Sequence, residues 1–362
     1  MKEPLVSRDR VDVLKAFAVV AVIFIHVVSI GQKFADKFAP YWFHLVTYDQ
    51  VLRFCVPLFI ALSGFGLAAK YSDSHLAERN QKIDLKDFYL RRVTKLLPQY
   101  LFFAVVLYSF LLLMQPVTGE IVHYNFFQAI FLGRADYHLY FVPLIFQFYL
   151  LFPLLFWIVK KNIWVALLIT LFVQVGVFYV IGLKTETPSY NEPWNDQRQY
   201  ILAISWVFYF VLGISLGLVR SVNAKRLRFC TLAALVLTVI GLGWTLFNAQ
   251  RMVLSGIDLQ AATRFTRVPV LVYSTGLIVF ALFVKINLSK ASPLRNLRGA
   301  LLQIGRNSYT TYLLHTLVLR LFVLFVPFLI TQNLFVFGFL VVVVSIVSSE
   351  VFNRVLNFRL KK

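Results

Sequence analysis

Apolar runs of about 20 residues recur from the first residues to the end of the chain, and they limit the fold more than any other feature. A helix of that length crosses the hydrocarbon core of a bilayer, where only helices and closed barrels satisfy their backbone hydrogen bonds. The alternating apolar and polar pattern of a membrane barrel is absent. Only 14% of the residues are charged, against about 25% in soluble domains. We therefore predict an all-α, polytopic integral membrane protein.

The apolar runs predict about ten transmembrane helices in a single membrane domain, residues 1–362. The predicted spans cover residues 11–31, 50–70, 96–115, 138–159, 163–182, 199–220, 228–248, 267–286, 307–327 and 334–354. The first span is expected to be retained, because no small-residue cleavage site of a signal peptide follows it. The two cysteines, Cys55 and Cys230, indicate neither a disulfide framework nor a metal site.

Basic residues concentrate in one set of the predicted loops. The segment 70–95 holds seven Lys and Arg residues, whereas the loop after the first span holds Lys33 and Lys37. Because cytoplasmic loops of membrane proteins are basic, we predict a multi-pass protein of the cell membrane with both termini in the cytoplasm. The formal net charge of +20 then reflects contact with lipid headgroups, and no nucleic-acid partner is expected.

The stretch KAFAVVAVIFIH, residues 15–26, places two ionisable groups in the first span. Eleven residues separate Lys15 from His26, so the two lie within about 20° of one direction and roughly 16 Å apart along a helix. Asp12 is three residues before Lys15, at a spacing that allows an ion pair. Either Lys15 extends to the headgroups and His26 bonds a neighbouring helix, or the stripe lines a cavity. In the second case Lys15 holds an anion and His26 performs proton chemistry, for which its ordinary pKa near 6.5 is suited.

Other polar groups recur at the ends of spans or inside them. Arg92 and Lys95 share a helix face at a predicted cytoplasmic entrance, where they suit a phosphorylated ligand, although the topology rule explains their charge equally well. His138, Tyr140 and His315 lie within predicted spans. The polar segment 183–198 is either a sugar-binding loop, because it joins aromatic and carboxylate groups, or an ordinary solvated loop.

Five segments, taken in order, resemble the membrane acyltransferase-3 family. They are RDRVDVLKAFAVVAVIFIH (8–26), VPLFIALSGFGLA (56–68), LRRVTKLLPQY (90–100), DYHLYFVPLIFQFYLLFP (136–153) and NSYTTYLLH (307–315). The first resembles the family's opening motif, with Asp12, Lys15 and His26 in place. Two departures stand out. Lys95 replaces the second arginine of an Arg-x-x-Arg motif and loses its bidentate geometry, and Tyr140 stands where tryptophan is common.

The resemblance implies an integral-membrane O-acyltransferase that uses cytoplasmic acyl-CoA, often acetyl-CoA, and no metal. It implies a carbohydrate or glycolipid acceptor, as in stand-alone members of the exopolysaccharide type without an extracellular hydrolase-like domain. On this hypothesis Lys15, Arg92 and Lys95 bind the donor and His26 is the general base. His315 assists proton transfer, and His138 and Tyr140 position the acceptor.

Two other classes of function remain open at this stage. A polysaccharide exporter accounts for ten helices and a basic interior stripe without acyl-CoA or an obligatory base, although no inverted repeat is evident. A purely structural membrane protein is disfavoured, because an idle Lys15 and His26 inside a span are costly.

Overall fold

The computed structural model describes residues 6–35, 40–73, 83–118, 124–186, 198–219, 221–257, 259–284 and 295–359 of the chain. Within these ranges the regular structure is helical and contains no strand. The chain divides into two compact units. Unit 1 comprises residues 1–62 and 219–362, and unit 2 comprises residues 63–218. The prediction of an all-α chain is confirmed, while a single membrane domain stays a prediction.

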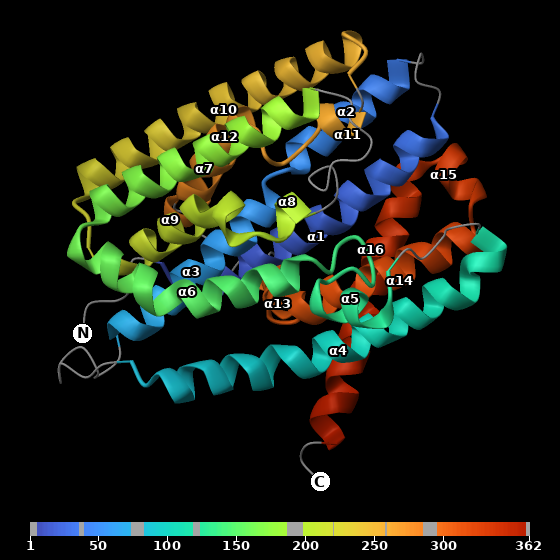
Figure 1. The fold of residues 1–362 in the computed structure, drawn as a ribbon, viewed down its shortest axis with the longest axis horizontal. Helices are drawn as coiled ribbons and strands as arrows, with labels where there is room; N and C mark the ends of the chain where they lie inside the picture. Colours follow the sequence, from blue (N-terminus) through green and yellow to red (C-terminus); the bar gives the residue numbers. More distant parts are fainter. Residues whose placement is uncertain are drawn as a thin grey trace. The chain divides into compact units, whose positions relative to one another are not determined.

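Unit 1 joins the two ends of the sequence. Its helices are α1 (Arg8–Phe34), α2 (Pro40–Leu52), the start of α3 (Cys55–Asp73), α10 (Ala224–Leu254), α11 (Leu259–Ala262), α12 (Val268–Phe283), α13 (Arg295–Arg306), α14 (Ser308–Phe325), α15 (Phe328–Gln332) and α16 (Leu334–Arg359). Figure 1 shows α10 and α12 side by side, and a Cβ at Gly276 of α12 would lie only 2.7 Å from the Thr238 nitrogen of α10. Small residues thus let these two backbones approach closely.

Unit 2 is formed by the middle of the sequence. It holds the rest of α3, then α4 (Leu85–Thr118), α5 (Phe126–Phe131), α6 (Phe141–Lys161), α7 (Ile163–Glu186), α8 (Arg198–Ile201), the 3₁₀ turn η1 (Ala203–Trp206) and α9 (Val207–Leu218). Gly217 of α9 packs on α3, since a Cβ there would lie 2.7 Å from the Phe65 carbonyl oxygen. The core is aromatic, with the Phe148 and Phe210 rings stacked at 4.5 Å between centroids.

Eight helical segments among the described residues are long and apolar enough to cross a membrane, and two shorter apolar segments occupy the places of the other two predicted spans. The shorter segments are Ala203–Leu218 and Val268–Phe283. The predicted span 138–159 begins instead at Phe141, because residues 132–140 form a series of turns. A polytopic helical membrane protein is therefore confirmed.

The predicted span 50–70 is part of a longer segment, Tyr41–Ser72, which is broken into α2 and α3. The break falls at Arg53 and Phe54. Pro57 causes it, because this residue has no N–H to donate to the Arg53 carbonyl four residues earlier. The next amide, Leu58 N–H, donates to the Phe54 carbonyl at 2.9 Å and continues α3.

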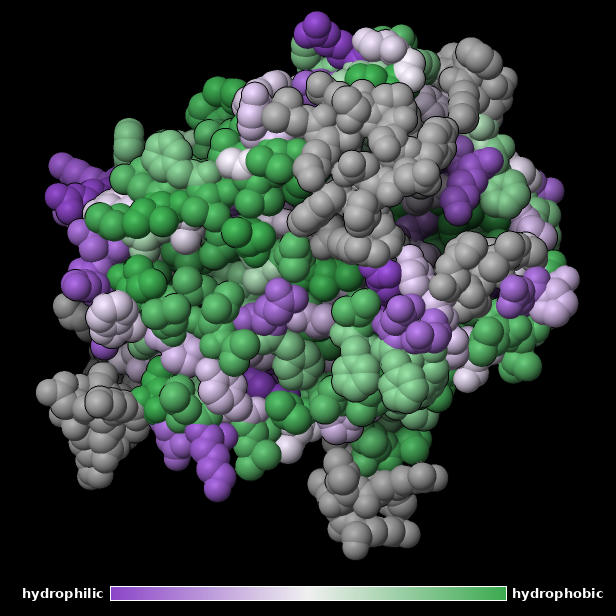
Figure 2. Space-filling view, in the orientation of Figure 1, coloured by the Kyte–Doolittle hydropathy of each residue, from purple (hydrophilic) through white to green (hydrophobic). Residues whose placement is uncertain are grey.

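The long helices expose large apolar side chains. Phe229 and Phe247 of α10 are 73% and 65% exposed, and Trp164 and Phe172 of α7 are 75% and 73% exposed. In Figure 2 hydrophobic residues cover much of the described surface seen from this side. Exposed apolar area on this scale marks an interaction surface, and on helices of spanning length the lipid tails are the partner.

Candidate active site

The first turns of α1 carry a bridged pair of cations. The Lys15 Nζ lies 3.1 Å from Asp12 Oδ1, so the predicted pairing of these two residues is confirmed. The Arg306 Nε, at the end of α13, lies 3.7 Å from the other oxygen of the same carboxylate. Lys15 and Arg306 keep 36% and 60% of their side chains exposed. One carboxylate therefore holds a half-buried and an exposed cation next to each other.

Helix α13 is fixed on α1 by backbone contact and by a second ion pair. Gly305 lies so close to the Asp12 carbonyl that a Cβ would collide with it. Arg298, two turns earlier, binds Asp9 at 2.5 Å. The apolar and basic residues of RNLRGALLQIGR lie on different faces of the helix. The packing of α13 thus determines where the Arg306 guanidinium lies.

Two histidines meet deeper in unit 1. The rings of His26 on α1 and His315 on α14 stack with centroids 5.4 Å apart and an interplanar angle of 23°. His26 is half-buried and His315 is fully buried. The His315 Nδ1 lies 2.6 Å from the Tyr312 carbonyl oxygen. Because a carbonyl only accepts, Nδ1 carries the proton and donates it, which leaves Nε2 as the basic nitrogen of the neutral ring.

The continuous helix α1 separates the cations from the histidines. It runs without a break from Arg8 to Phe34, so Lys15 and His26 lie roughly 16 Å apart along its axis. An anion bound at Lys15 and Arg306 and a reaction at His26 are therefore compatible with an extended donor molecule that joins the two.

Unit 2 contains the second predicted basic cluster. The Arg92 guanidinium on α4 lies 4.5 Å from the ring centroid of Phe88 and 6.0 Å from those of Tyr71 and Tyr149. Arg92 is half-buried among these rings, whereas Lys95 is exposed. The rings stabilise the cation and fix its place. This aromatic shell was not predictable from the sequence, since its members come from three helices.

His138 and Tyr140 also belong to unit 2, in the turns before α6. His138 is buried, and its Nδ1 lies 3.9 Å from the buried Asp136 carboxylate. The Tyr140 ring lies 5.9 Å from that of Tyr200. Asp136 was not singled out from the sequence, although its place two residues before His138 was visible. Most of segment 183–198, for which a sugar-binding loop and an ordinary solvated loop were both considered, lies outside the described residues.

The predicted site residues thus fall into two groups. Lys15, His26 and His315 belong to unit 1, where the structure stacks the two histidines. The members of the second group are in unit 2: Arg92, Lys95, His138 and Tyr140. Arg306 joins the first group through Asp12 and was not among the predicted site residues. In the described part of the chain, no three His, Cys, Asp or Glu side chains are grouped to hold a metal ion.

Comparison with known proteins finds relatives that are named as acyltransferases. YfiQ of Bacillus subtilis (strain 168), provisionally named a membrane-bound acyltransferase, is 24% identical over 316 residues, which are 84% of this chain and 79% of YfiQ. The O-acetyltransferase OatA of Staphylococcus aureus (strain NCTC 8325 / PS 47) is 26% identical over 223 residues, 55% of this chain. That match spans only 34% of the length of OatA. No solved structure matches the chain.

The family comparison covers nearly the whole chain. The acyltransferase-3 family profile, described as an acyltransferase domain, matches residues 8–353. This range begins at the first residue of α1 and includes both the bridged cations and the histidine pair. The chain therefore belongs to the acyltransferase-3 family of membrane acyltransferases.

Proposed function

We propose that this membrane acyltransferase moves an acyl group, specifically acetyl, from cytoplasmic acyl-CoA to a hydroxyl of a cell-surface or exported carbohydrate. The stacked His26–His315 pair carries the proposal, because His26 lies on the same helix, α1, as Lys15, the residue that Asp12 holds next to Arg306 of α13. Basic side chains match the phosphates of a CoA donor. A deep histidine supplies the base that a hydroxyl acceptor requires.

The proposed reaction is a direct transfer. His26 removes the proton of the acceptor hydroxyl while the oxygen attacks the thioester carbonyl. The new C–O bond forms, the C–S bond breaks, and CoA leaves as a thiolate that takes up a proton. His315 stacks on His26, and its own ring is held in one orientation by the Tyr312 carbonyl. His315 therefore positions the base and limits its rotation.

Unit 2 supplies further groups in this proposal. Arg92, held by its aromatic shell, and the exposed Lys95 add positive charge for the donor. His138 and Tyr140 contribute to acceptor binding. The polysaccharide exporter uses no general base, so the histidine pair favours the transferase.

The first test replaces His26 by alanine. We expect release of CoA from [acetyl-14C]acetyl-CoA by inside-out vesicles to fall by about 100-fold or more, the usual contribution of a general base. His44→Ala is the matched control, since His44 is exposed on α2 of the same unit. Equal release by the His26→Ala and wild-type proteins, at equal protein levels, would exclude His26 as the base.

A further inference from the structure

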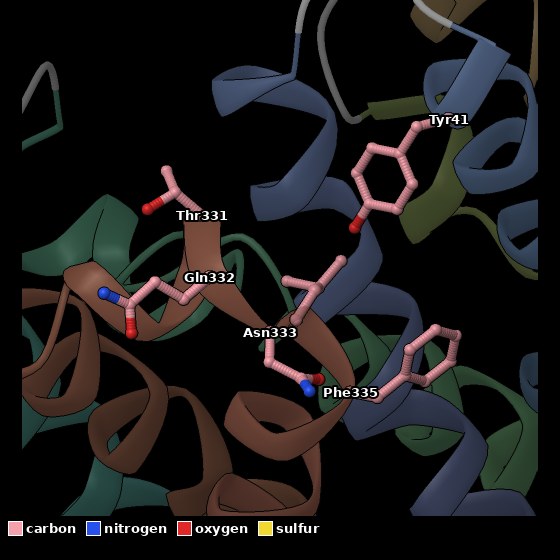
Figure 3. A pocket seen from close by; sticks show the side chains of 6 residues that line it. Tyr41, Thr331, Gln332, Asn333 and Phe335 are labelled. Carbon is pink, nitrogen blue, oxygen red and sulfur yellow. The ribbon is translucent and has the colours of Figure 1, made fainter.

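A cleft lies in unit 1 at the end of α1 opposite to Lys15. Its volume is about 320 Å³, and it is lined by Tyr41 of α2 and by Thr331, Gln332, Asn333, Leu334 and Phe335 at the turn from α15 to α16. Figure 3 shows the Tyr41 ring with its hydroxyl directed toward this turn, and Phe335 on the α16 side. This volume is at the lower end of the range of ligand pockets, about 300–1,000 Å³, and suits a single sugar ring.

The cleft is built on rigid parts of the unit. Trp42, the neighbour of Tyr41, is buried with Val46 against Ala249 of α10, which fixes α2. The Asn333 side chain accepts the Val336 amide at 3.1 Å and begins α16. Tyr41 therefore faces the turn from a helix that is held on its other side.

The lining chemistry matches a carbohydrate. Tyr41 and Phe335 are 44% and 57% exposed, and their ring faces carry the negative potential that attracts the C–H faces of a sugar. The Gln332 side chain offers an amide to a sugar hydroxyl, and the Thr331 hydroxyl, which donates to the Phe328 carbonyl at 3.0 Å, can still accept a hydrogen bond from one. The described side chains that line the cleft are uncharged, and their aromatic, amide and hydroxyl groups match a neutral polar ring.

The position along α1 connects the cleft to the histidine pair. Leu334 of the cleft packs directly on Gly31 of α1, where a Cβ would lie 2.5 Å from its Cδ2. Gly31 is five residues beyond His26, a rise of about 8 Å. Helix α1 therefore orders the bridged cations, the histidine pair and the cleft from one end to the other.

On the basis of the proposed function, we infer that the cleft between Tyr41 and the α15–α16 turn binds the carbohydrate acceptor. The sugar ring in the cleft is the one next to the hydroxyl that receives the acyl group. The donor then reaches His26 from the cation end and the acceptor from the cleft end. The bound sugar lies against the Phe335 ring, within reach of the Tyr41 hydroxyl.

The experiment measures transfer from [acetyl-14C]acetyl-CoA to envelope polysaccharide of the producing cells, de-O-acetylated with mild alkali. We expect Phe335→Ala and Tyr41→Ala to raise the KM for polysaccharide by about tenfold, with the KM for acetyl-CoA unchanged. Phe339→Ala is the matched control, because Phe339 is an exposed phenylalanine one turn further along α16 that does not line the cleft. Tyr41→Phe keeps the ring and separates its contribution from that of the hydroxyl.

The outcomes separate this inference from the function on which it rests. Absence of transfer by the wild-type protein would overturn the proposed function and the cleft assignment with it. Transfer by the wild type, together with Phe335→Ala and Tyr41→Ala variants that match Phe339→Ala, would overturn the cleft alone. A parallel rise in the KM values for polysaccharide and for acetyl-CoA in both alanine variants would show that Tyr41 and Phe335 act through the fold, and would also overturn the cleft assignment.

Discussion

Asp12 holds together the two cations that are proposed to bind the donor. Its carboxylate holds Lys15 on its own helix and approaches Arg306 on α13. Isolated, exposed side chains of this length would lose conformational entropy on binding an anion. The shared carboxylate restricts the conformations of both side chains before any ligand binds. Binding a phosphate between them would therefore cost less conformational entropy.

Replacing Arg306 by glutamine tests this interpretation. We expect the KM for acetyl-CoA to rise by about tenfold, because a charge-assisted contact to phosphate is lost. With acetyl-pantetheine, a donor that lacks the phosphates and the nucleoside, the KM should stay unchanged. Steady-state kinetics with both donors provides the comparison.

Arg354→Gln is the control for that measurement. Arg354 is also an exposed arginine of unit 1, and it forms an ion pair with Glu350 one turn earlier on α16. Arg354→Gln should leave the KM values for acetyl-CoA and for acetyl-pantetheine unchanged. If Arg306→Gln raised the KM equally for the two donors, Arg306 would act through the fold and would not bind phosphate.

At the scale of elements, α13 depends on the absence of a side chain at Gly305. A methyl group there would collide with the Asp12 carbonyl. We expect Gly305→Ala to lower the free energy of unfolding by about 1–3 kcal/mol through overpacking, and to displace Arg306 from Asp12. Thermal unfolding in detergent, followed by circular dichroism, measures the change.

Gly299 offers a matched control on the same helix. A Cβ at Gly299 meets no atom within 4 Å, so Gly299→Ala should stabilise α13 by about 0.5–1 kcal/mol through its higher helix propensity. Opposite signs for the two substitutions would confirm the packing of α13 on α1. A stabilising Gly305→Ala would show that α13 does not pack against Asp12.

Some elements could be predicted from the sequence and others could not. Long apolar runs predict helices directly, as α1 and α10 show, because membrane burial depends on local composition. Helix α13 escaped prediction, since five of its 12 residues are basic or carry a side-chain amide and it contains no long apolar run. The break before α3 lies inside an apolar run and so was not predicted. Its cause is Pro57, which has no N–H to continue the helix across this point.

In the candidate site, too, local contacts could be predicted from the sequence and long-range contacts could not. The Asp12–Lys15 pair was predictable, because three residues place two side chains on one helix face. The stacking of His26 on His315 was not, since 289 residues separate the two and only tertiary packing brings them together. Arg306 was hidden for the same reason: its partner, Asp12, lies at the other end of the chain.

At the scale of the whole molecule, the proposed reaction requires that the cation end of α1 faces the cytoplasm. Helix α10 allows a direct test, because its 31 residues extend about 46 Å, enough to cross a bilayer with its headgroups. Its first residues include Lys225, Arg226 and Arg228, whereas its last turn holds only Arg251. The topology rule therefore places its start in the cytoplasm. The cation end of α1 lies on the same side, because Arg10 of α1 donates to the Leu282 carbonyl at 3.0 Å, near the end of α12, and α12 runs antiparallel to α10.

Cysteine labelling from each side of the membrane determines this orientation. In a Cys230→Ser background, we expect Ser255→Cys to react with a membrane-impermeant maleimide in intact cells, with the outer envelope permeabilised where one is present. Ser221→Cys should react only in inside-out vesicles, and both serines are exposed at the ends of α10. The reverse pattern would place Lys15 and Arg306 outside, where no acyl-CoA is available, and would exclude a cytoplasmic donor. The expected pattern leaves the α15–α16 cleft on the side where exported carbohydrate is found, so that donor and acceptor approach His26 from opposite sides of the membrane.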